Sequence, residues 1–135
     1  MALANAGYAE LVAGNPIEAL GLLGRAERLS PHDLKSWYIA GATALACFAT
    51  AQYERAVCWS NKALAQNPRF APSMRTLAAS LAKLRRMDDA AQVVPRILNE
   101  DPHTSVADVR WKHRQMHESV LSPWLEGLRL AGLPR

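Results

Sequence analysis

Apolar residues recur along the chain at helical spacing, and short polar breaks that contain proline or glycine divide this pattern into segments. The main breaks are Gly14-Asn15-Pro16, Ser30-Pro31, Asn67-Pro68 and Asp101-Pro102. No stretch alternates β-branched and polar residues with a period of two, so we predict no β-sheet. The pattern predicts seven or eight helices, at about 2–13, 16–29, 34–50, 53–66, 72–84, 87–101, 104–118 and 122–131.

A repeat about 34 residues long runs from about residue 2 to residue 104. Its marker is an alanine, a second small or apolar residue seven positions later, and a proline five positions after that. The three copies are Ala19, Ala26 and Pro31; Ala56, Ala63 and Pro68; and Ala90, Ile97 and Pro102. A period near 34 is typical of helix–turn–helix arrays. We expect units at about 1–33, 34–70 and 71–104, followed by a C-terminal helical cap over 105–135.

The third unit carries the clearest family pattern. Its first helix has Met74, Leu77, Ala78 and Leu81 at the positions of the tetratricopeptide motif, and Ala90, Val94 and Pro102 follow at those of its second helix. The other two units keep the small residues and the prolines. The chain therefore resembles tetratricopeptide-repeat (TPR) proteins. This resemblance implies an all-α fold, an α-α superhelix of three helix–turn–helix units with C-terminal capping helices.

A narrower resemblance involves three short segments. Residues 46–49 (Ala-Cys-Phe-Ala), 53–57 (Tyr-Glu-Arg-Ala-Val) and the tail at 124–134 are similar to the repeats that follow the catalytic domains of bacterial class III adenylate/guanylate cyclases. The resemblance implies that the chain is a C-terminal fragment of a larger bacterial signalling protein, with a catalytic domain before Met1.

Composition narrows the classes of partner. The chain has 135 residues, half of them hydrophobic, and a formal net charge of +4 without any block of five like charges. We therefore expect no nucleic-acid partner and no charged membrane anchor. The longest apolar run, 37–51, is shorter than the ~20 residues that span a bilayer. Only two cysteines and no basic start of a secretory signal favour a cytoplasmic location.

We find no pattern of residues that supports catalysis. There is no glycine-rich phosphate loop, no nucleophile elbow and no metal-binding carboxylate pair, so we expect neither an enzyme nor a cofactor. His113 and His117 share a face of the predicted helix 104–118, but Arg114 follows the first histidine where metalloproteases have glutamate. We expect no metal site. Cys47 is expected in the core and Cys58 on the outside, neither of them redox-active.

The first helix of each unit lines the concave side of such a superhelix. This face is apolar at one end and basic at the other, which suits an amphipathic helix or an extended peptide with an acidic end. We therefore predict a protein-interaction module with a regulatory or assembly role. A small-ligand-sensing domain of a nucleotide cyclase is the alternative, and packing on the chain's own C-terminal helix is equally open. The predicted groove residues are Tyr8, Leu11, Tyr38, Leu45, Phe48, Arg75 and Lys83.

The tail carries two apolar stripes. Val106, Val109 and Met116 form one, beside Trp111, and we expect this first tail helix to cover the third unit. The second stripe either folds back into the groove or docks on another copy, which gives a two-fold dimer. The predicted cap or dimer contacts are Trp111, Leu121, Trp124, Leu125 and Leu128.

Overall fold

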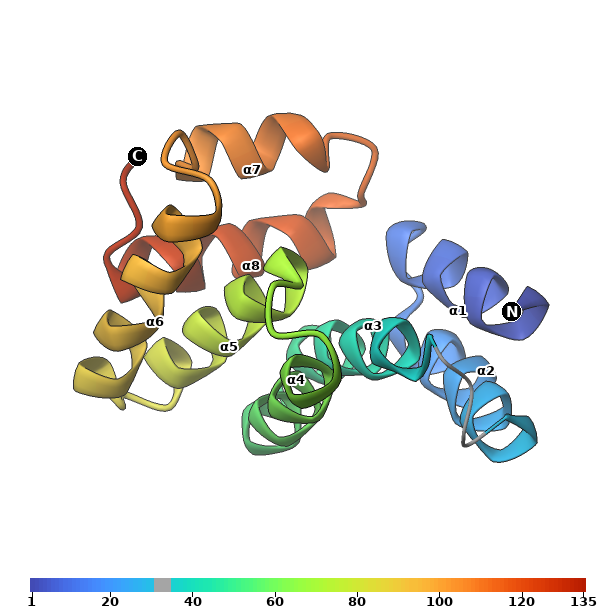
Figure 1. Ribbon diagram of the computed structural model, residues 1–135. Coiled ribbons are helices and arrows are strands. Elements are labelled where there is room, and N and C mark those ends of the chain that lie inside the picture. Colours follow the sequence, from blue (N-terminus) through green and yellow to red (C-terminus); the bar gives the residue numbers. More distant parts are fainter. Residues whose placement is uncertain (31–34) are drawn as a thin grey trace.

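The computed structural model describes residues 1–30 and 35–135, and this part of the chain has eight α-helices and no β-strand (Figure 1). The all-α prediction is confirmed. Among the described residues, no helix has both the length and the apolar character that crossing a membrane requires. The helices are α1 (Ala2–Val12), α2 (Pro16–Leu29), α3 (Ser36–Ala49), α4 (Tyr53–Gln66), α5 (Ala71–Lys83), α6 (Met87–Glu100), α7 (Val106–Lys112) and α8 (Glu118–Ala131).

The first six helices begin and end close to the predicted positions, although the start expected at residue 34 lies outside the described residues. The two tail helices were predicted wrongly. Helix α7 ends at Lys112 instead of 118, and α8 begins at Glu118 instead of 122. The reason is an N-cap that the hydrophobic pattern does not indicate. Nδ1 of His117 accepts a hydrogen bond from the backbone N–H of Ser119 at 3.1 Å, so α8 begins directly after His117.

Small residues let consecutive helices pack closely. Ala44, Ala56, Ala78 and Ala90 have no exposed surface, as expected for positions where paired helices cross. At Gly7 in α1, an added Cβ would lie 2.8 Å from the Leu23 side chain of α2. Helices α1 and α2, α3 and α4, and α5 and α6 form antiparallel pairs, and α2 and α4 also pack on the next pair.

Helix α8 lies on α5, with smaller contacts to α3 and α6, while α7 packs on α8 (Figure 1). The prediction that the first tail helix covers the third unit is therefore wrong, since the second one packs on that unit. The physical reason is the extent of the apolar stripe. The 14-residue α8 buries Leu121, Trp124, Leu125 and Leu128, whereas the 7-residue α7 has one buried residue, Val109.

Two backbone hydrogen bonds fix the C-terminal segment, residues 105–135: one holds the loop between α7 and α8 on α1, and the other joins the two ends of the segment. The N–H of His117 donates to the carbonyl of Val12 in α1 at 2.8 Å, and the N–H of Val106 donates to the carbonyl of Pro134 at 2.7 Å. Gly14 supports the first of these contacts. Its φ of +92° suits glycine, and a Cβ there would lie 2.8 Å from the His117 ring.

Pro95 lies inside α6 on its exposed side, where it cannot donate the backbone hydrogen bond that continues the helix. We expect the substitution Pro95→Ala to raise the free energy of unfolding by about 1 to 3 kcal/mol, since proline is disfavoured by ~3 kcal/mol relative to alanine in a helix interior. Urea unfolding followed by circular dichroism measures this change. A variant no more stable than the parent chain would contradict the prediction.

Candidate functional site: a concave groove and an aromatic chamber

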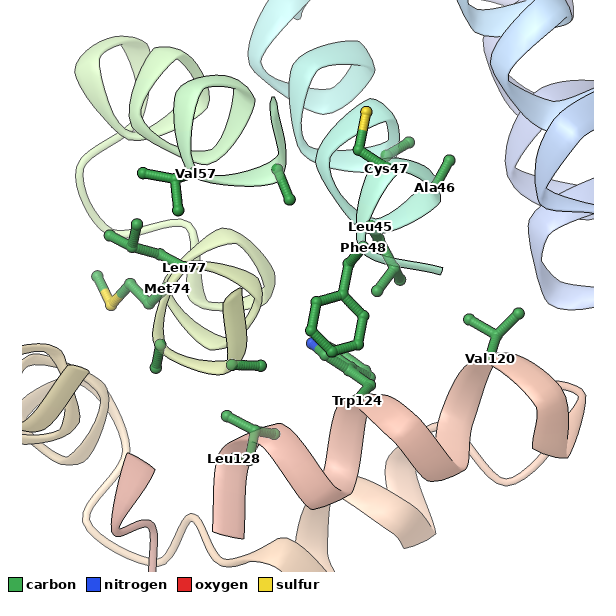
Figure 2. Close-up of a cluster of buried hydrophobic side chains, with 14 of the residues drawn as sticks. Leu45, Ala46, Cys47, Phe48, Val57, Met74, Leu77, Val120, Trp124 and Leu128 are labelled. Carbon is green, nitrogen blue, oxygen red and sulfur yellow. The ribbon is translucent and has the colours of Figure 1, made fainter. Parts of the chain in front are cut away.

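The concave groove, which we define as the inner faces of α1, α3 and α5, already holds a helix. The apolar stripe of α8 enters it, and Figure 2 shows Trp124 of α8 and Phe48 of α3 in one cluster of buried side chains. The approach is close at Gly127, where an added Cβ would lie 2.7 Å from Cβ of Ala79 in α5. Helix α8 therefore occupies the part of the groove formed by α5 and the C-terminal half of α3.

The rest of the groove is a pocket that we call the aromatic chamber. It has a volume of about 290 Å³ and walls of aromatic and aliphatic side chains. Helices α1, α3 and α5 supply most of the walls, while His113 and Trp124 come from the C-terminal segment. The lining residues are Tyr8, Trp37, Tyr38, Gly41, Ala42, Leu45, Phe70, Pro72, Thr76, His113 and Trp124.

Rings in the chamber wall meet mostly edge to face. The centroids of Trp37 and Phe70 are 4.8 Å apart, and those of His113 and Trp124 are 5.0 Å apart, both with edge-on geometry. Gly41 leaves the space for Phe70, because an added Cβ would lie 2.6 Å from that ring. The indole N–H of Trp124 is buried without an acceptor among the described residues.

The two tyrosines of the chamber are neutral hydroxyls. The rings of Tyr8 and Tyr38 lie 6.2 Å apart at an interplanar angle of 51°. Burial raises the pKa of Tyr8, with a smaller contribution from Tyr38, and burial also raises the pKa of Tyr38. Thr76 donates its hydroxyl to the carbonyl of Pro72 at 3.0 Å. The chamber therefore presents almost no charge to an occupant.

A buried cation lies behind the chamber. Arg75 of α5 is only 6% exposed, and its Nη1 is 3.4 Å from Nε2 of His113. Burial lowers the pKa of Arg75, while Asp108 and Asp101 oppose this change. The pKa of His113 is lowered below its usual value of 6.5. Burial is the largest cause, followed by the positive charges of Arg75 and Lys112. The imidazole is therefore neutral at pH 7.

This environment predicts a pH-dependent stability. Because the pKa of His113 is lower in the folded than in the unfolded chain, the unfolded chain binds more protons as the pH falls through 6.5. The free energy of unfolding should therefore decrease with falling pH in this range. We expect His113→Gln to reduce this slope between about pH 5 and 7.5, as thermal melts at several pH values would show. An unchanged slope would contradict the assignment.

Next to the chamber lies a more polar recess of about 270 Å³, which shares Tyr8 and His113 with it. Lys112 and Arg114 contribute to this recess. Both charged groups already interact with neighbouring side chains. Lys112 forms ion pairs with Asp101 at 3.1 Å and with Asp108 at 3.0 Å. The guanidinium of Arg114 lies 4.1 Å from the centroid of the Trp111 ring.

The structure divides the predicted groove residues among several environments. Tyr8, Tyr38 and Leu45 line the chamber. Leu11 and Phe48 are buried in the core. Lys83 lies near Glu126 of α8. The hydrogen bond from Arg129 is the main cause of the lowered pKa of Glu126, and the charge of Lys83 contributes to it. The sequence analysis missed the chamber residues Trp37, Gly41, Ala42, Phe70, Pro72, His113 and Trp124 as groove positions.

The remaining predicted residues can also be placed. Trp111 is 65% exposed and lies outside the contact of α8 with the groove. Cys47 is buried and Cys58 exposed, both as free thiols, which confirms their predicted positions. His113 and His117 do not share a helix, because the first follows α7 and the second precedes α8. Within residues 1–30 and 35–135, no three His, Cys, Asp or Glu side chains are grouped to hold a metal ion.

No protein family and no curated protein matches this chain. Its function is therefore inferred from the geometry of the groove and the chamber.

Proposed function

We propose that the chain is a tetratricopeptide-type protein-interaction module whose concave groove binds an amphipathic helix of a partner protein. The observation that carries this proposal is α8 itself, which is seated in the groove by an i, i+3, i+4, i+7 stripe of Leu121, Trp124, Leu125 and Leu128. A groove that binds one amphipathic helix has the shape and apolar character to bind another.

Charge supports the same class of partner. Lys83 lies at the end of α5 and lowers the pKa of Glu126 on α8 through its positive charge, as a contribution secondary to Arg129. This electrostatic interaction agrees with a partner helix that carries an acidic residue facing Lys83. Glu126 is exposed and Lys83 is partly exposed, so the interaction favours one orientation of the helix more than it adds affinity.

In this proposal α8 is an intramolecular competitor. A partner helix binds only when α8 leaves the groove, so the partner shifts an equilibrium between docked and released forms of the C-terminal segment. The resemblance to cyclase C-terminal regions suggests the setting that we propose, a regulatory or assembly role in a larger bacterial signalling protein. The module itself carries out no chemistry in this proposal.

The test uses α8 as its own probe. A fluorescein-labelled peptide of residues 116–133 is added to the wild-type chain and to a double variant, Leu121→Asp with Leu128→Asp, which weakens docking of α8 and leaves the groove unchanged. We expect the peptide to bind the double variant at least about tenfold more tightly than the wild type, because the tethered α8 competes at high effective concentration. Fluorescence polarisation measures both affinities.

Two controls make the result specific. A matched peptide with Trp124→Ala and Leu128→Ala should bind much more weakly, and Ala79→Lys in the double variant should block the groove. Circular dichroism must show that each protein variant remains helical. If the double variant unfolds, Gly127→Leu replaces it as the release variant. The proposal fails if a folded release variant does not bind the peptide, or binds both peptides equally.

A further inference from the structure

Helix α8 leaves the aromatic chamber unfilled, and the chamber has its own chemistry. We infer that it is a binding site for a neutral, planar aromatic molecule of about one or two rings, and that such a ligand holds α8 in the groove. Ligand binding to the chamber does not depend on the proposed function. The effect of the ligand on partner binding rests on that function.

The size of the chamber limits the ligand. Its volume of about 290 Å³ is at the lower end of the range for small-molecule pockets, roughly 300–1,000 Å³. A dry apolar cavity of about 150 Å³ already binds benzene. The chamber therefore fits one or two fused rings, and it is too small for a complete helix.

The walls select for a flat, uncharged ring system. Five aromatic side chains and His113 surround the space, and aromatic rings in edge or offset contact gain about 0.5–1.5 kcal/mol per pair beyond burial. Among the residues that the structure describes, no Asp, Glu, Lys or Arg lines the chamber, and the lowered pKa of His113 keeps its ring neutral. A charged ligand would lose its hydration without gaining an ion pair there.

Ligand binding is coupled to the docking of α8, because the chamber is lined by residues from both the groove and the C-terminal segment. Trp124 belongs to α8, and His113 follows α7. On the other side, Tyr8 and Tyr38 belong to α1 and α3, and Phe70 immediately precedes α5. A molecule in the chamber contacts both sides only when α8 is docked. It therefore binds the docked form more tightly and shifts the equilibrium toward it. A small molecule would thus control access to the groove.

The four tryptophans allow a test with internal controls. Trp37 and Trp124 line the chamber, while Trp59 and Trp111 lie outside it. The full chain, labelled with ¹⁵N, is titrated at pH 7 with 2-naphthol, and the indole N–H signals are followed by NMR. Two probes of similar size serve as comparisons: decahydro-2-naphthol, which is saturated, and 2-naphthoate, which is an anion.

We expect 2-naphthol to shift the Trp37 and Trp124 signals with saturation and to leave Trp59 and Trp111 unchanged. Both comparison probes should bind at least about tenfold more weakly. Ala42→Phe, which fills the chamber, should abolish the shifts, and Ile17→Phe, at an exposed position, should preserve them. If Ala42→Phe does not fold, Tyr38→Ala removes part of the wall and should weaken binding.

Three results would overturn the inference. The first is the absence of a saturable shift at Trp37 and Trp124. The second is equal binding of the saturated or anionic probe. The third is unchanged amide hydrogen exchange across α8 at saturating 2-naphthol. A ligand that holds this helix in the groove should slow that exchange. The peptide-binding assay described under the proposed function contains no small molecule. It therefore tests partner binding independently of the ligand site.

Discussion

Replacing Trp124 with alanine is expected to lower the free energy of unfolding by about 3 to 5 kcal/mol, the range for truncating a large aromatic side chain in a core. Trp124 has no exposed surface, packs on His113, and belongs to the central stripe of α8. Its loss leaves a cavity between α8 and the groove. Urea unfolding, monitored by circular dichroism, gives the difference from the wild-type chain.

The matched control is Trp111→Ala in the same C-terminal segment. Trp111 is 65% exposed, and its contact with Arg114 is a surface cation–π pair, so we expect a loss of only about 0.5–1 kcal/mol. Similar losses for the two substitutions would show that α8 is not held in the groove as described. A Trp124→Ala chain as stable as the wild type would contradict the whole arrangement.

Gly127→Leu is expected to destabilise the chain by about 3 kcal/mol, at the upper end of the usual range for overpacking. Any side chain at this position meets α5, because even a Cβ would be 2.7 Å from the Cβ and 3.1 Å from the Cα and the carbonyl oxygen of Ala79. Two of these atoms are backbone, so they cannot move aside as a flexible side chain would. Helix α8 must therefore shift out of the groove, which thermal melts and amide hydrogen exchange would detect.

Gly21→Leu is the matched control, since Gly21 is also inside a helix but has none of the described residues within 4 Å of an added Cβ. Leucine has a higher helix propensity than glycine, so this variant should gain up to about 0.8 kcal/mol. The two substitutions are therefore expected to have opposite signs. If both stabilise the chain, α8 does not approach α5 as closely as the structure indicates.

The sequence predicts the helices well where punctuation is explicit. Proline and asparagine at positions 15–16 and 67–68 end or begin helices within two residues of the observed bounds. The predicted start of the last helix at 122 is wrong. His117 caps α8, which begins at Glu118, four residues before the predicted start, so Pro123 lies inside the helix.

The site is less predictable than the helices, because it depends on contacts between distant segments. The repeat register places Tyr8, Tyr38 and Leu45 on the concave side, and they do line the chamber. It also places Phe48 there, but that ring is buried in the core. How closely α8 approaches α5 depends on the fit of Gly127 against Ala79. Helical periodicity carries no information about this fit.

The position of the C-terminal segment has a consequence for how the chain unfolds. In a linear array each unit contacts only its neighbours, so units can open one at a time from an end. Here one segment touches α1 through Val12 and Gly14, and α8 packs on α3, α5 and α6. Opening the first pair of helices therefore also breaks contacts of the C-terminal segment, so we expect the three helix pairs to unfold in a single cooperative event.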